Sequence, residues 1–229
     1  MALYPVNLNI AGRLCVVVGG GSVAFRKISS LLECGAEVRI VSPSVTVALE
    51  KIIQEQGLVW LKRAFAEGDL QGAYLAFAAT SRPEVQALVK RDALHFQVLL
   101  NSADDPEGSD FHVPAHFRRG EMLVAISTGG GSPALSRQTR QWLEQEIGPE
   151  YEATVALLAL VREAVLDRGG DSVDNKELFQ NLLKADIVEM IRNGDWFELQ
   201  ILLLRELPAD IDTTRLLEKF LSEHDKTMH

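Results

Sequence analysis

Residues 14–27 constrain the fold of this chain more than any other segment, because an apolar run passes directly into a glycine turn and then into a helical pattern. Leu14 to Val18 is a continuous run rich in valine, typical of a strand covered on both faces. The turn fits G-x-G-x-x-G/A, in which small residues let backbone approach a pyrophosphate and let the helix pack on the strand. The sequence therefore predicts a dinucleotide site formed by Gly19, Gly20, Gly21, Ser22, Val23 and Ala24.

The residues that follow complete a strand-helix-strand unit. Residues 22–34 carry apolar side chains at helical spacing, Gly35 is typical of a helix C-terminus, and Val38 to Val41 is a second apolar strand. Three glycines after an apolar run also fit a tight structural turn. The flanking strand and helix favour the dinucleotide site.

The second strand lacks the acidic residue that commonly binds a ribose 2′-hydroxyl roughly 20 positions after the glycines. It ends in Val41-Ser42-Pro43. Ser42 can hydrogen-bond a ribose, and we include it, with Thr80 after a later strand, among the predicted cofactor-binding residues. Arg39 is in principle within reach of a 2′-phosphate, although strand alternation favours a solvent-facing side chain. The residues themselves leave NAD and NADP open.

Helical and strand patterns alternate through the first half of the chain. Further helices are predicted over 44–56 and 83–95, and further strands over 58–61, 73–78 and 98–101. This alternation predicts an α/β fold, a Rossmann-like doubly wound parallel sheet whose ligands gather at the carboxyl ends of the strands. Those ends hold Gly19, Ser42, Thr80 and residues 101–105.

The pattern changes beyond this region. Residues 123–127 read as a strand, 128–133 as a second glycine-rich turn, and 133–147 as a helix with Ser132 as its cap. From Glu150 the chain reads as helices only, with apolar stripes in the segments 155–165, 178–191 and 199–203. We therefore expect a nucleotide-binding domain over 1–115, a small α/β segment over 116–149 and an all-helical region over 150–229.

Composition excludes several classes of protein. The chain has 229 residues, 47% of them hydrophobic and 24% charged, with a net charge of −9, which permits a substantial core and argues against a nucleic-acid surface. No apolar stretch is long enough to cross a bilayer, and the first residues lack the features of a signal peptide, so we expect a cytoplasmic protein. Cys15 and Cys34 have neither disulfide-framework nor metal-ligand spacing, and no metal site is predicted.

Several blocks together resemble a known family. They are Val18-Gly-Gly-Gly-Ser-Val-Ala-Phe-Arg-Lys27, Ala78-Ala-Thr80, Asn101-Ser-Ala-Asp-Asp-Pro106, Asp110-Phe-His-Val-Pro114 and Ile126-Ser-Thr-Gly-Gly-Gly-Ser-Pro-Ala-Leu-Ser-Arg137. Their order and spacing resemble the N-terminal module of siroheme synthase, the precorrin-2 dehydrogenase family, over roughly residues 3–165. The resemblance implies NAD-dependent oxidation of precorrin-2 to sirohydrochlorin, in some relatives with insertion of ferrous iron as a second substrate. It also implies a homodimer formed largely by the segment after the nucleotide domain.

Asp104 is the candidate catalytic base. Oxidation of a reduced tetrapyrrole removes a hydride and a proton, so the site needs a group to receive the proton. Asp104 follows the strand at 98–101 at the predicted cofactor edge of the sheet, and the resemblance assigns this position to the catalytic aspartate. The alternative is a turn before Pro106, where aspartate is favoured. Asp105 is the weaker candidate, although adjacent carboxylates raise one pKa when both are partly buried.

A substrate with many carboxylates requires local positive charge in an acidic protein. Arg118, Arg119, Arg137 and Arg140 lie around the second glycine turn, where they also fit ordinary solvated charges. The backbone N–H groups of that turn offer a further carboxylate site. The predicted substrate-binding residues are Thr128, Gly129, Gly130, Ser132, Arg137 and Arg140. His112 and His116 fit structural roles better than metal binding.

Two other classes of function remain open. A nucleotide-sensing regulatory module would also combine this fold with helical dimerisation elements, but it has no need of the Asp-Asp-Pro segment. A non-catalytic helical interaction protein would explain the tail but not the glycine turn.

Overall fold

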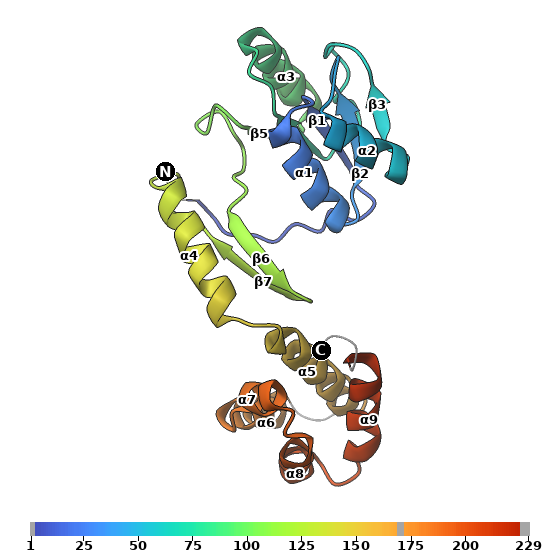
Figure 1. Cartoon of the computed structure of the whole chain (residues 1–229), viewed down its shortest axis with the longest axis vertical. Coiled ribbons are helices and arrows are strands. Elements are labelled where there is room, and N and C mark those ends of the chain that lie inside the picture. The colour runs from blue at the N-terminus through green and yellow to red at the C-terminus, as the bar shows by residue number, and fades with distance from the viewer. Residues whose placement is uncertain (1–2, 169–171, 225–229) are drawn as a thin grey trace. The chain divides into compact units, whose positions relative to one another are not determined.

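A computed structural model describes residues 3–168 and 172–224 of the chain. The chain divides into two compact units, Met1–Val113 and Pro114–His229, which are described separately (Figure 1). The three-part division predicted from the sequence stays a prediction.

The first unit is built on a five-stranded parallel sheet in the order β3-β2-β1-β4-β5. Its strands are β1 (Leu14–Val18), β2 (Glu37–Val41), β3 (Val59–Leu61), β4 (Leu75–Ala78) and β5 (Leu99–Ser102). The chain leaves β1 toward β2 on one side and later returns to β4 on the other, so the strand order reverses between β1 and β4. This topology confirms the predicted doubly wound sheet.

Helices cover both faces of this sheet, as parallel sheets require. On one face, α1 (Ser22–Glu33) and α2 (Val47–Gln56) pack in a core that includes Cys15 and Val17 of β1. On the other face, α3 (Pro83–Phe96) packs in a core that includes Val16 and Val18. The alternating side chains of β1 thus enter two different cores, which explains its unbroken apolar sequence.

The connection from β3 to β4 runs through residues 62–74 without a helix. This segment contributes Phe65 and Leu70 to the same core as α3. The predicted strand at 73–78 begins later, at Leu75, and the predicted helix at 44–56 begins at Val47 because Thr46 is its N-cap.

The second unit begins with an antiparallel pair, β6 (Ala115–Arg119) and β7 (Met122–Ile126), followed by α4 (Pro133–Glu146). Strand β6 is absent from the sequence prediction, because Ala-His-Phe-Arg-Arg carries little apolar signal. Helix α4 contacts both strands, and its N-cap Ser132 accepts a hydrogen bond from the N–H of Leu135 at 3.2 Å.

The rest of the second unit is helical, as predicted. Its helices are α5 (Glu150–Leu166), α6 (Ser172–Lys184), α7 (Ile187–Asn193), α8 (Trp196–Glu206) and α9 (Thr213–His224). Their buried faces meet in one core around Leu157, Leu203 and Phe220. The predicted stripe over 178–191 is divided between two helices, because Asp186 takes a left-handed conformation with φ of 54°. Within the described part of the chain, no helix combines the length and apolar character needed to cross a membrane.

Candidate functional site

A pocket of about 510 Å³ opens at the carboxyl ends of β1, β2 and β4 in the first unit. This is the point where the strand order reverses, and parallel sheets of this type bind ligands there. Five of the predicted cofactor-binding residues line the pocket, namely Gly19, Gly20, Gly21, Ser42 and Thr80. The sequence motif therefore lies in the wall of a cavity of the size that small-molecule ligands occupy.

The glycine turn is compact because two of its three glycines lie where a Cβ atom would clash with neighbouring backbone. Gly19 has a φ of +133°, and a Cβ atom there would lie 2.2 Å from the carbonyl oxygen of Ala79. A Cβ atom on Gly20 would lie 2.0 Å from the carbonyl oxygen of Ser44. A Cβ atom on Gly21 would meet nothing within 4 Å. The first two glycines are thus required by the fold, and the third faces open space.

The N-terminus of α1 follows this turn without a capping side chain. Its N-cap is Gly21, and its first turn contains no acidic residue. The first N–H groups of a helix lack intrahelical partners and carry partial positive charge, so this end suits an anionic group. Ser22 and Val23 lie in the first turn, outside the pocket lining. Ala24 is fully buried in the core, where it lets the helix pack on the sheet.

The end of β2 uses its polar groups within the fold. The hydroxyl group of the buried Ser42 donates a hydrogen bond to the carbonyl oxygen of Ser44 at 2.6 Å. The backbone carbonyl oxygen of Ser42 accepts a hydrogen bond from Trp60 Nε1 at 2.9 Å. The Ser42 Oγ lone pairs remain acceptors for a ribose hydroxyl. Among the described residues, the pocket lining contains no carboxylate, and the charged residue in it is Arg82, which pairs with Glu84 at 2.7 Å.

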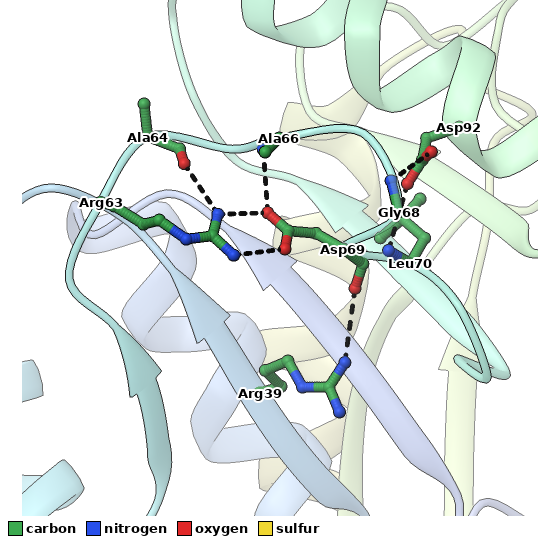
Figure 2. A network of polar contacts seen from close by, with 8 residues as sticks. All are labelled: Arg39, Arg63, Ala64, Ala66, Gly68, Asp69, Leu70 and Asp92. Carbon is green, nitrogen blue, oxygen red and sulfur yellow. Dashed lines mark hydrogen bonds and ion pairs between the residues drawn. The ribbon is translucent and has the colours of Figure 1, made fainter.

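One wall of the pocket is held by a polar network that the sequence did not predict (Figure 2). Ala64 and Phe65 line the pocket. Next to them, Arg63 donates two hydrogen bonds of 2.7 Å to the carboxylate of Asp69. The later part of this loop, residues 62–74, is bound to α3. There, Asp92 accepts hydrogen bonds from the N–H groups of Gly68 and Leu70 at 2.9 and 3.1 Å. These contacts hold the helix-free connection between β3 and β4 against α3.

The Arg63–Asp69 pair affects the titration of both groups. Burial acts to raise the pKa of Asp69. The net shift is nevertheless downward, because Asp69 accepts hydrogen bonds from Arg63 and from the N–H of Ala66 and lies near the positive charges of Arg63 and Arg39. Arg39 also donates to the carbonyl oxygen of Asp69 at 3.4 Å. The Arg39 side chain therefore binds the loop (Figure 2).

Asp104 and Asp105 follow β5 at the same edge of the sheet but have different partners. Gln86 of α3 donates one hydrogen bond to Asp104 Oδ2 at 3.0 Å and another to the carbonyl oxygen of Thr80 at 2.6 Å. Asp105 accepts a hydrogen bond from the N–H of Gly108 at 2.9 Å and pairs with Lys90 at 3.4 Å. The Gly108 hydrogen bond and then Lys90 lower the pKa of Asp105. The raised pKa considered for adjacent carboxylates is thus wrong for Asp105, because its carboxylate is exposed and has two donors.

The second glycine turn, in the second unit, uses most of its N–H groups internally. Thr128 Oγ1 accepts from the N–H of Ser132 at 3.1 Å, and the carbonyl of Thr128 accepts from Gly131 at 3.0 Å. The N–H of Gly129 donates to Ser127 Oγ at 3.2 Å. The role predicted for Thr128, Gly129, Gly130 and Ser132 in binding a carboxylate stays a prediction, and these internal bonds leave few donors for it.

The arginines near this turn divide into two groups. Arg119 donates to the carbonyl oxygens of Glu144 and Ile147, at 2.8 and 3.0 Å, and so caps the end of α4. Arg140 pairs with Glu144. Arg118 and Arg137 are exposed. The last two are therefore the more available for an anionic ligand.

The two histidines considered in the sequence contact backbone. His112 Nε2 lies 3.1 Å from the carbonyl oxygen of Pro106, and His116 Nδ1 lies 3.0 Å from that of Pro114. Among residues 3–168 and 172–224, no group of three or more His, Cys, Asp or Glu side chains is arranged to hold a metal ion.

Comparisons with known proteins agree with this geometry. Residues 6–115 match a family described as "Putative NAD(P)-binding". Siroheme synthase from Azotobacter vinelandii is 35% identical over 207 residues, covering 90% of this chain and 45% of that protein. Siroheme synthase from Methylobacillus flagellatus is 35% identical over 194 residues, covering 85% and 42%, respectively. The chain therefore spans less than half the length of these relatives.

A solved structure, "SirC, precorrin-2 dehydrogenase", has the same fold, with a TM-score of 0.70 over 96% of this chain and all of that chain, at 23% identity. This match confirms the predicted fold class. The chain is thus similar to siroheme synthases over most of its own length, and its residues 6–115 match the family described as "Putative NAD(P)-binding".

Proposed function

We propose that this chain is an NAD-dependent dehydrogenase that converts precorrin-2 into sirohydrochlorin. The observation that carries the proposal is the connection of a dinucleotide-type pocket to a carboxylate: Gln86 bonds both the Thr80 carbonyl, in the pocket wall, and Asp104. The homology to siroheme synthases supports a tetrapyrrole as the substrate.

The residues of the pocket fit a dinucleotide. The N–H groups at the start of α1 suit its pyrophosphate, because no side chain caps them and no carboxylate lines the pocket. Ser42 and Thr80 are the polar residues that we assign to its riboses. We assign NAD rather than NADP, because Arg39 and Arg82 both have partners other than a 2′-phosphate. Arg39 binds the carbonyl oxygen of Asp69, and Arg82 pairs with Glu84.

The oxidation removes a hydride and a proton from the substrate. An oxidised nicotinamide, when bound, supplies the hydride acceptor. The carboxylate of Asp104 receives the proton, since it is exposed and its protein partner is a neutral amide. Asp105 instead stabilises the turn, because its carboxylate accepts a hydrogen bond from the N–H of Gly108 and pairs with Lys90.

We also propose that the chain works as a homodimer through β6, β7 and α4. Helix α4 carries two exposed apolar side chains, Leu135 at 53% and Trp142 at 58% exposed. A second copy of this segment would cover them.

Arg118 and Arg137 are the side chains of the second unit that we assign to substrate carboxylates.

Anaerobic incubation of the protein with precorrin-2 and NAD tests the proposal. We expect NADH absorbance to rise together with the spectrum of sirohydrochlorin. A nucleotide-sensing module would bind NAD without consuming precorrin-2. Ferrous iron added in a second step tests for insertion of the metal into the product.

A further inference from the structure

Gln86 occupies a special place on α3, because its side-chain amide joins two groups that differ in role. One N–H donates to the carbonyl oxygen of Thr80 at 2.6 Å, and the same nitrogen donates to Asp104 Oδ2 at 3.0 Å. A side-chain amide has two N–H donors in a fixed plane, so both are used. The orientation of the Asp104 carboxylate is thus tied to the backbone of the pocket wall.

The next turn of α3 shows a contrasting contact. Lys90, four residues after Gln86, lies on the same side of the helix and pairs with Asp105. One helix face therefore presents a neutral amide to Asp104 and a cation to Asp105. An ammonium group favours the charged carboxylate strongly, whereas an amide orients a carboxylate with less effect on its charge.

We infer that Gln86 is a positioning residue for Asp104, which holds Oδ2 against the pocket wall so that Oδ1 receives the substrate's proton. The inference rests on the proposed function. Sequence alone gives no signal for it, because a glutamine on an amphipathic helix is ordinary. In the oxidation, the substrate loses a hydride from one C–H bond and a proton from a second bond to hydrogen. A bound oxidised nicotinamide would accept the hydride, and Asp104 Oδ1 would accept the proton.

Gln86→Glu is the most direct test, because it preserves size but removes both donors and places a second carboxylate beside Asp104. We expect kcat to fall at least about tenfold while the Kd for NAD changes less than about twofold. The acidic limb of the pH profile of kcat should move to higher pH, because the negative charge of one carboxylate disfavours ionisation of the other. Gln86→Leu, which removes the donors without adding charge, should lower kcat with a smaller movement of that limb.

Two controls separate positioning from a general structural effect. In an Asp104→Ala background, Gln86→Glu should have no further effect on kcat, since a residue that acts through Asp104 loses its influence when Asp104 is absent. Gln54→Glu makes the same charge change at an exposed position of α2 and should leave kcat and its pH profile unchanged.

The outcomes distinguish this inference from the proposed function. Wild-type turnover of precorrin-2 together with unchanged kcat and pH profile in both Gln86 variants would overturn the role of Gln86 alone. Additive losses in the double variant would also overturn it. Lack of turnover by the wild-type protein would overturn the proposed function and the inference with it.

Discussion

At the scale of single residues, two adjacent aspartates illustrate how the fold assigns different roles to the same side chain. Asp105 is held by the N–H of Gly108 and by Lys90, which together lower its pKa and fit it to a turn. Asp104 is exposed and contacts Gln86. A carboxylate with a lowered pKa is a weaker base, so Asp105 is poorly suited to proton transfer.

Asp104→Ala is expected to lower the turnover of precorrin-2 at least about tenfold, because the reaction loses its proton acceptor. NAD affinity and the melting temperature should stay close to wild type, since Asp104 lies outside the pocket lining and the cores. Anaerobic kinetics and thermal unfolding measure these quantities. Asp105→Asn is the matched variant, and it should retain turnover. Wild-type turnover in Asp104→Ala would remove Asp104 from the mechanism.

The glycine turn allows a second prediction from paired variants. Gly20→Ala should lower the melting temperature, because its Cβ atom would lie 2.0 Å from the carbonyl oxygen of Ser44. Gly21→Ala should fold normally, since its Cβ atom meets nothing within 4 Å. We expect it to weaken NAD binding by about tenfold if backbone at the turn contacts the pyrophosphate. Titration calorimetry measures the affinity, and wild-type affinity in Gly21→Ala would place the phosphates elsewhere.

Sequence predicts these residues unequally. Gly19, Gly20 and Asp104 belong to local patterns whose chemistry is visible along the chain. Gln86 and the Arg63–Asp69 pair are not predicted, because their roles arise from contacts that the folded loop and α3 create. The hydrogen bond from the Ser42 hydroxyl to the carbonyl oxygen of Ser44 is not predicted either, because no periodicity reveals such a local contact. The role of Ser42 in binding a ribose stays a prediction.

At the scale of elements, residues 62–74 connect β3 to β4 without a helix and contribute Ala64 and Phe65 to the pocket lining. Asp92 is 2% exposed and accepts from the N–H groups of Gly68 and Leu70. Asp92→Ala would leave these donors unpaired, and we expect the free energy of unfolding to fall by about 2–4 kcal/mol. Urea denaturation measures the change. Asp92→Asn, which keeps one acceptor oxygen, should lose less, and equal losses would contradict this account.

Asp69 in the same loop predicts a pH dependence. Its pKa in the folded protein lies below the ordinary value of 3.8, despite the opposing effect of burial, because Arg63 and the N–H of Ala66 bind the carboxylate. The contribution to stability is therefore full above that ordinary value and is lost as pH falls through the lower folded value. We expect the unfolding free energy of wild type to decline more steeply below about pH 4 than that of Asp69→Asn. Parallel slopes would contradict this expectation.

Elements were predicted from sequence to the extent that their apolar pattern is local. Strand β1 is recognised because both of its faces are buried, whereas β6 was missed because Arg118 and Arg119 interrupt its short sequence. Arg119, the last residue of β6, caps the end of α4 through carbonyl oxygens 25 and 28 residues later in the chain, and no local pattern predicts this contact.

At the scale of the whole molecule, the chain comprises a first unit that holds the proposed dinucleotide pocket and a second unit that begins with β6, β7 and α4. The exposed Trp142 makes the predicted dimer testable. Trp142→Glu should convert a dimer into a monomer, because burial of a charge in an apolar interface is unfavourable. Light scattering after size exclusion measures the mass. Glu146→Gln on the same helix is the control, and a dimeric Trp142→Glu variant would contradict the proposed interface.

The stoichiometry of anaerobic turnover with NAD and precorrin-2 tests the proposed dehydrogenase activity. We expect one NADH to form for each sirohydrochlorin, and we expect both products to be lost together in Asp104→Ala. NAD binding without any NADH formation, or oxidation of precorrin-2 at the same rate in the absence of NAD, would contradict it.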